Sequence, residues 1–360
     1  MTMIRPIAEG DLDALISMAH ESGVGFTSLP DNPELMVKKL ARAVASFRGE
    51  LPPEQRHYMF VMQVSADGPP VGLCGIEARI GHDDVGYNYR LGAVIQASKA
   101  LGVYRRTPTL FLSNDLTGAT ELGSLFLREP ARRNRNGSVL SKCRMMFLAA
   151  FPQLFSQRVI AEMRGYSDDQ GFSPFWDGLG RQFFNIEFSD ADFLTGTGDK
   201  VFIAELMPKF PIYIPMLPAS AQEVIGNVHP RTEPALALLQ AEGFRKNGYV
   251  DIFDAGPTIE CQLDSIGGVS RSFMAQVQID TGASASHNAR QSNTGDTRES
   301  APRWLIGNDR FADFRVISAA AIDYRPSKIT LTAEQAGSLL VSAGDTVRIM
   351  SIQPEETSNE

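Results

Sequence analysis

The chain has 360 residues, of which 43% are hydrophobic and 21% are charged, and its formal net charge is −8. This length exceeds one typical domain, and the composition is ordinary for a globular protein. The acidic balance argues against general nucleic-acid binding, and no apolar run is long enough to cross a bilayer. We therefore expect neither a nucleic acid nor a membrane as a partner.

Three isolated cysteines, Cys74, Cys143 and Cys261, fit neither a disulfide framework nor a zinc site. Buried free thiols in a reducing compartment are the simplest interpretation, and they favour a cytoplasmic protein. The N-terminal residues 1–12 lack the apolar core of a signal peptide, which agrees with this location. We expect no metal centre.

The first half of the chain alternates between helical and strand patterns. Apolar residues at helical spacing predict helices that begin near Asp11 and after Asp31-Asn32. Apolar runs bounded by turn residues predict strands at 3–6, 58–65, 71–80, 88–96, 109–113 and 122–127. The second and third of these strands form a hairpin. A long helix is then predicted at 138–155, followed by a strand at 158–165.

The second half continues this mixed pattern and changes in composition after about Cys261. We expect helices at 174–180, 219–226, 233–242 and 333–340, and strands at 201–206, 248–254, 315–322, 327–331 and 343–352. The polar segment 284–302 is expected to be a mobile loop. The predicted organisation is a main domain at 1–260 and a small β-rich module at 261–360.

A turn crowded with arginines joins the predicted strand at 122–127 to the long helix. The N–H groups of a first helical turn are unpaired, and the helix dipole favours an anion beside them. The arginines add positive charge, and a glycine lets the backbone approach a ligand closely. We expect a receptor for a phosphate group, although a solvated basic connection would show the same residues. The candidates are Arg132, Arg133, Arg135, Asn136, Gly137 and Ser138.

The order of these elements, the hairpin and the basic turn resemble the acyl-CoA-dependent N-acetyltransferase superfamily. The resemblance implies an α+β fold with a mixed, mostly antiparallel sheet flanked by helices. In that superfamily the pyrophosphate of coenzyme A (CoA) binds backbone amides of a loop written Q/R-x-x-G-x-G/A. The residues Arg132–Gly137 occupy this position, and Arg135 stands where the first glycine usually lies.

Longer segments resemble the arginine N-succinyltransferase family over essentially the whole chain. They include PTLFLSNDLTGATELGSLFL at 108–127, GFSPFWDGLGRQFF at 171–184 and VHPRTEPALALLQAEGF at 228–244. The family's basic turn usually resembles R-S-G-L-N-G, and Asn134 replaces its inner glycine. The resemblance implies transfer of a succinyl group from succinyl-CoA to the α-amino group of L-arginine, without a tightly bound cofactor.

Two other interpretations stay open at the level of sequence. One is an arginine/ornithine succinyltransferase subunit of a hetero-oligomer, and the other is a subunit that binds CoA without catalysing. We expect either a homo-oligomer or a hetero-oligomer with a paralogous chain.

The resemblance also implies roles for individual residues. His229 lies in the V-H-P context of the family's active-site histidine, which implies a proton donor or shuttle, and an imidazole titrates near neutral pH. Leu125 matches the leucine that contacts succinyl-CoA, so its backbone is expected to hold the thioester. Candidates for binding the succinyl carboxylate are Arg90 and Arg164. Candidates for binding the guanidinium of the acceptor are Glu121, Glu162 and Asp115.

Overall fold

The structure is a computed structural model. It describes residues 1–23, 26, 28–65, 68–82, 85–168, 170–188, 190–191, 194, 201–280, 304–325 and 327–352, and for 201, 202 and 204 the backbone alone. The predicted loop at 284–302 lies outside the described residues.

The described strands form one continuous sheet. They are β1 (Met3–Pro6), β2 (His57–Gln63), β3 (Gly72–Glu77), β4 (Asn88–Ser98), β5 (Val103–Ser113), β6 (Thr120–Leu127), β7 (Arg158–Glu162), β8 (Ile212–Tyr213), β9 (Arg245–Asp251), β10 (Pro257–Gln262), β11 (Phe273–Ile279), β12 (Trp304–Gly307), β13 (Val316–Ala319), β14 (Asp323–Arg325), β15 (Lys328–Leu331) and β16 (Thr346–Ser351). Their order is β14-β15-β11-β16-β12-β13-β1-β2-β3-β6-β7-β10-β9-β4-β5-β8. Neighbours are antiparallel except for β11 with β15 and β6 with β7. The predicted mixed, mostly antiparallel sheet is confirmed.

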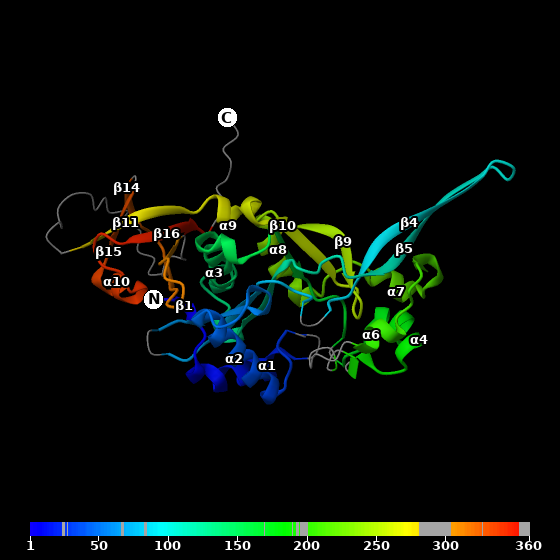
Figure 1. Ribbon diagram of the computed structural model, residues 1–360, viewed down its shortest axis with the longest axis horizontal. Coiled ribbons are helices and arrows are strands. Elements are labelled where there is room, and N and C mark those ends of the chain that lie inside the picture. The colour runs from blue at the N-terminus through cyan, green and yellow to red at the C-terminus, as the bar shows by residue number, and fades with distance from the viewer. Residues whose placement is uncertain are drawn as a thin grey trace, which may run out of the picture.

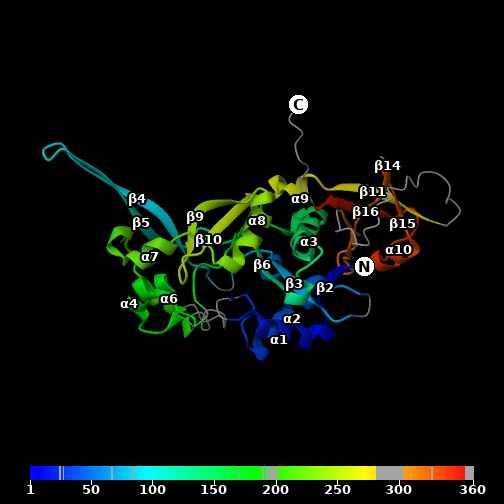
Figure 2. The same ribbon diagram turned by 180° about the vertical axis from the view of Figure 1, so that it is seen from behind.

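The described helices lie on both faces of this sheet. They are α1 (Leu12–Ser22), α2 (Pro33–Arg48), α3 (Asn136–Ala150), α4 (Arg181–Phe184), α6 (Val201–Leu206), α7 (Ala219–Val224), α8 (Glu233–Ala241), α9 (Gly267–Ser270) and α10 (Ala333–Leu339). Helices α1 and α2 lie below the central strands in Figure 1, and α3 lies on the opposite side of them (Figures 1 and 2). No described helix is long and apolar enough to cross a membrane.

The central strand β2 shows why three layers form here. Phe60 and Met62 pack into the apolar cluster beneath α3, whereas Met59 and Val61 pack against α1 and α2. Because side chains alternate along a strand, a strand that is apolar at successive positions needs cover on both faces. All seven residues of β2 are buried accordingly.

Helix α2 begins where its sequence predicts, and both of its ends are capped. The side chain of Asn32 accepts a hydrogen bond from the backbone N–H of Leu35 at 3.2 Å, which caps the N-terminus. Gly49 ends the helix in the left-handed conformation, with φ of 74°.

Two predicted elements differ from the structure. The segment at 201–206 was expected to be a strand but forms helix α6, because Ile203 and Met207, four residues apart, are buried in one cluster and joined by a helical hydrogen bond. Helix α3 ends at Ala150, five residues earlier than expected, since a residue before proline disfavours the helical conformation and Phe151 precedes Pro152.

The sequence interpretation also missed several strands and one large feature. The missed strands are β8, β10, β11, β12 and β14. Strands β4 and β5 are longer than predicted and pair with each other from Asn88–Ser113 to Ser98–Val103. Their far ends form a two-stranded arm that extends beyond the body of the molecule (Figure 1).

The strands after residue 261 extend the main sheet. Strand β13 pairs with β1, and the module around β11, β15 and β16 has an apolar cluster of its own beneath α10. Cys74 and Cys143 are buried free thiols, as expected, whereas Cys261 is only half-buried.

Candidate functional site

A cleft opens where strands β6 and β7 separate. The two strands pair in parallel only at Thr120–Val159 and Glu121–Ile160. Beyond this point β7 keeps its pairing with β10, and β6 diverges. A cavity of about 150 Å³ lies between Leu122–Leu125 on one side and Ala161–Arg164 on the other. The divergence therefore exposes the edge of β6 to a ligand.

A β-bulge shapes this edge. The register with β3 runs from Gly75–Gly123 to Leu73–Phe126, so that two residues of β6, Ser124 and Leu125, lie opposite one residue of β3. Ser124 has a left-handed backbone with φ of 51°. The inserted residue reverses the side-chain alternation: Leu122 packs beneath α3, but Phe126 packs against α1 and α2.

The basic turn ends in two left-handed residues, Asn134 and Arg135, with φ of 52° and 58°. Arg135 is the N-cap residue of α3. The N–H groups of Gly137 and Ser138 have no hydrogen-bond acceptor among the described residues. The space that a side chain at Gly137 would fill is open. The turn thus presents two backbone donors and a helix N-terminus, a combination that favours an anion.

The side chains of the turn have separate tasks. Asn136 braces the turn, because its N–H donates to Arg133 O and its Nδ2 donates to Ala131 O, both at 3.0 Å. Arg132 donates through Nε to Leu127 O at 2.9 Å. Arg132, Arg133 and Arg135 are exposed, so they add positive potential without being fixed in the core.

His229 lies beside the cleft and is held by its neighbours. Its N–H donates to Arg164 O at 2.9 Å, and its carbonyl accepts the N–H of Thr232 at 2.8 Å. Both partners line the cleft, although His229 itself is not among the lining residues. The imidazole is stacked near Tyr166, with ring centroids 6.4 Å apart. The residue as a whole is 7% exposed.

The imidazole also caps the short helix that leads into α8. Its Nδ1 accepts the backbone N–H of Arg231 at 3.0 Å. An accepting Nδ1 carries a lone pair, so the neutral ring holds its hydrogen on Nε2. The arrangement favours a ring that donates through Nε2.

Carboxylates collect at the start of the cleft. Glu121 and Glu162 line both the cleft and an adjoining pocket of about 240 Å³. The Nδ2 of Asn88 donates to Glu162 at 2.8 Å. Glu77 lies directly opposite Glu121 on the neighbouring strand. Two like charges in this position repel unless a cation neutralises one of them.

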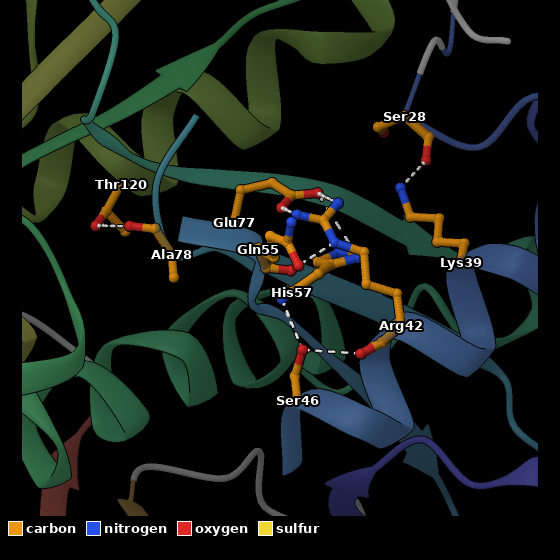
Figure 3. A network of polar contacts seen from close by, with 9 residues as sticks. All are labelled: Ser28, Lys39, Arg42, Ser46, Gln55, His57, Glu77, Ala78 and Thr120. Atoms are coloured by element: carbon orange, nitrogen blue, oxygen red, sulfur yellow. Dashed lines mark hydrogen bonds and ion pairs between the residues drawn. The ribbon is translucent and has the colours of Figure 1, made fainter. Parts of the chain in front are cut away.

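Figure 3 shows how helix α2 supplies that cation. Arg42 donates through both terminal nitrogens to the two carboxylate oxygens of Glu77, at 3.2 and 2.8 Å. Its Nε donates to Gln55 O at 2.6 Å. Lys39 donates to Ser28 O at 2.6 Å and so holds a residue that lines the cleft. The polar face of α2 therefore neutralises Glu77 and holds the wall of the cleft at Ser28 in place.

The other sequence-predicted residues lie in two places. Arg90 is exposed and pairs with Asp115 at 3.8 Å, and neither residue lines the cleft. A hydrogen bond from the Tyr249 hydroxyl lowers the pKa of Asp115. Arg164 does line the cleft, and its Nη2 donates to Ser167 Oγ at 3.0 Å.

Two cleft residues, Arg144 and Asp251, were missed from the sequence. Burial, and then the neighbouring Asp254 carboxylate, raise the pKa of Asp251 to about 7. Arg144 lies on α3 and is almost fully buried. The one sequence signal was a pair of charges, Lys142 and Arg144, within an otherwise apolar helix. No cluster of three or more potential metal ligands occurs among the residues described.

Comparison with known proteins identifies the family of this chain. Residues 2–268 match the family model described as arginine N-succinyltransferase beta subunit, and residues 287–351 match the model of its C-terminal domain. The chain belongs to the arginine N-succinyltransferase beta subunit family.

Other members of the arginine N-succinyltransferase family align over nearly the full length. Proteins named arginine N-succinyltransferase from Escherichia coli (strain 55989 / EAEC) and Shigella flexneri are each 46% identical over 356 residues, which is 99% of both chains. The solved structure of arginine/ornithine succinyltransferase subunit AI from Pseudomonas aeruginosa is 33% identical, with a TM-score of 0.85. That alignment covers 98% of this chain and 99% of the other.

Proposed function

We propose that the protein transfers the succinyl group of succinyl-CoA to the α-amino group of L-arginine, giving N2-succinyl-L-arginine and CoA. The observation that supports this most is that the cleft and the basic turn are joined by a single strand. Strand β6 leads from the open cleft straight into the turn whose amides at Gly137 and Ser138 lack acceptors within the described part of the chain. A single extended coenzyme fits this path, with its phosphates at the helix and its thioester at the bulge.

We propose the arrangement of the acyl-CoA-dependent N-acetyltransferase superfamily for this path. The bulge at Ser124 and Leu125 supports it, since an inserted residue turns backbone groups away from the ladder and toward the open edge. An extended pantetheine chain bonds such an edge as an added strand does. The Leu125 backbone is therefore the proposed contact for the thioester carbonyl, where a backbone N–H stabilises the oxyanion.

The chemistry needs one bond to form and one to break. The α-amine attacks the thioester carbonyl, the new C–N bond forms, and the C–S bond breaks. The amine loses a proton, and the departing sulfur takes one. His229 is the proposed donor, because its Nδ1 accepts the Arg231 N–H and its hydrogen is therefore on Nε2. The proton that the amine loses replaces the one that the ring passes to the sulfur, so the ring stays neutral overall.

Glu121 and Glu162 are the proposed receptor for the guanidinium of the acceptor. Both line the cleft and the adjoining pocket, whereas Asp115 lies outside the cleft. A guanidinium matches carboxylates in a planar, bidentate geometry. Ornithine, with a compact ammonium in its place, is the alternative acceptor.

The test is an assay of thiol release with purified protein and succinyl-CoA. We expect CoA to be released with L-arginine well above the rate without acceptor, and more slowly with ornithine. Release that does not respond to arginine would contradict the proposal and favour a subunit that binds CoA without catalysing. Faster turnover of ornithine would reassign the acceptor.

We also propose that the chain assembles with a second copy of itself, with a paralogous chain as the alternative. The arm of β4 and β5 supports this, because it exposes Ile95, Leu101 and Tyr104 at 58%, 78% and 72%. Residues 88–113 carry four basic residues and no acidic one, which leaves 30 basic and 42 acidic residues elsewhere. The free thiols fit a reducing, cytoplasmic location.

A further inference from the structure

Arg144 is a buried cation on the floor of the cleft. Its side chain is among the largest that are fully buried, and the residue is 1% exposed. Its Nε donates to Ser141 O at 3.1 Å, its Nη2 to Ser141 Oγ at 2.9 Å, and its Nη1 to Gly123 O at 3.5 Å. These contacts use three of the five N–H groups of a guanidinium. One N–H on each terminal nitrogen is left.

No carboxylate within the described ranges forms an ion pair with Arg144. The ionisable groups that act electrostatically on Arg144 are the thiols of Cys74 and Cys143. Burial raises the pKa of Cys143 well above its ordinary value, so this thiol stays neutral and does not balance the charge. Burial likewise lowers the pKa of Arg144. A buried cation with only neutral partners is costly to keep.

The position of Arg144 relates it to the acyl group. It reaches the carbonyl of Gly123, two residues before Leu125 on the same strand. Two extended strand residues would span about 7 Å, and the left-handed Ser124 between them makes the separation shorter, within reach of a four-carbon diacid chain. Among the described residues that line the cleft, Arg144 and Arg164 are the only cations, and Arg164 lies on the opposite wall.

We propose that Arg144 binds the distal carboxylate of the acyl donor and so selects a succinyl group over a neutral acyl group of the same length. The inference rests on the proposed succinyl-CoA-dependent activity. The carboxylate supplies the missing counter-charge, and two remaining N–H groups on neighbouring nitrogens suit a bidentate contact. Ser141 and the Gly123 carbonyl position the guanidinium.

The test measures donor binding by calorimetry without any acceptor. The two probes are succinyl-CoA and butyryl-CoA, which has four acyl carbons but no carboxylate. We expect the unaltered protein to bind succinyl-CoA roughly tenfold to hundredfold more tightly, the worth of one or two hydrogen bonds between charged groups. Arg144→Gln should remove this preference and leave butyryl-CoA binding nearly unchanged.

Arg158→Gln is the matched control, because Arg158 pairs with Glu260 at the end of β7 remote from the cleft, and it should keep the preference. The proposal would be overturned if Arg144→Gln weakened the binding of succinyl-CoA and butyryl-CoA equally. It would also be overturned if the unaltered protein bound the two donors with equal affinity. Should Arg144→Gln not fold, Ser141→Ala removes the hydroxyl that positions Nη2, and an unchanged preference there would also overturn it.

These measurements separate the inference from the activity on which it rests. Binding without acceptor does not depend on whether arginine is the acceptor, so a failed transfer assay leaves the donor preference measurable. Conversely, transfer to arginine with no difference between the two donors in binding would contradict the role of Arg144 alone.

Discussion

At the scale of single residues, His229 has a structural task, and we propose a chemical one for it. The ring caps a helix through Nδ1 and keeps its hydrogen on Nε2. Asparagine at this position can still accept the Arg231 N–H through its side-chain oxygen, but it offers no imidazole. We predict that His229→Asn keeps the unfolding temperature and CoA affinity while turnover falls by roughly 100-fold or more.

His229→Ala removes both functions, so it should also lose about 1 kcal/mol of stability through the missing cap. Steady-state kinetics with thermal unfolding distinguishes the two variants. Turnover close to that of the unaltered protein in His229→Asn would remove the imidazole from the chemistry.

Asp251 gives a prediction about pH. Burial raises its pKa to about 7, so the folded state holds a proton that the unfolded chain releases near pH 4. The contribution of the protonated Asp251 to the free energy of unfolding is full below about pH 4 and is lost as the pH rises through 7. Asp251→Asn keeps an oxygen for the N–H groups of Phe253 and Asp254.

The expected result is that Asp251→Asn gains a few kcal/mol in the free energy of unfolding at pH 8 and little at pH 4. Denaturant titrations at both values measure this. A gain of the same size at both pH values would show that the carboxyl group does not titrate as proposed.

The residues of the site were predictable to different degrees. His229, Leu125 and the basic turn lie in contiguous segments, so they can be identified by matching these segments to those of a known family. Arg144 was not predictable from the sequence. It is a candidate because it is buried without a counter-charge among the described residues, and this situation can be seen only once helix α3 is packed on the sheet. Arg90 was a plausible choice from its segment, but the fold directs it to Asp115 outside the cleft.

At the scale of elements, one buried ion pair joins helix α3 to the segment just after α8. Lys142 on α3 pairs with Glu242 just after α8, with both side chains almost fully buried. Removing one partner leaves an uncompensated buried charge. We predict that Lys142→Met lowers the free energy of unfolding by roughly 3–5 kcal/mol, and that adding Glu242→Leu recovers much of this loss.

A double-mutant cycle in denaturant measures the coupling between Lys142 and Glu242. If the two losses simply add, the pair does not hold α3 to the segment after α8.

Most elements of the core were visible in the sequence because their apolar periodicity agrees with their packing. The bulge in β6 was not visible, since it depends on the register with β3. Helix α6 was predicted as a strand because six mostly apolar residues fit both the helical and the strand periodicity. Only the burial of Ile203 and Met207 in one cluster distinguishes the two.

At the scale of the whole molecule, the arm of β4 and β5 is the feature that is hardest to account for if the protein is a monomer. A two-stranded ribbon alone is marginally stable in water. Strands β4 and β5 pair along 11 residues each, and their far ends, which form the arm, expose apolar side chains. Its basic character complements the acidic remainder of a second copy. The sequence showed strands here but not their projection from the body, which no local pattern encodes.

We predict that light scattering gives the mass of a dimer or larger assembly for the unaltered chain. Exchanging Leu101 and Tyr104 for serine should shift it toward the monomer. Both side chains lie at the far end of the arm, so the body should keep its unfolding temperature. A monomeric unaltered protein would contradict assembly through the arm.

The most direct measurement is a crystal structure of the protein soaked with CoA. The account predicts electron density for the diphosphate at the amides of Gly137 and Ser138, with the pantetheine arm along β6 and the sulfur beside Leu125. Density for the coenzyme at another surface, with the cleft between β6 and β7 still empty, would contradict it.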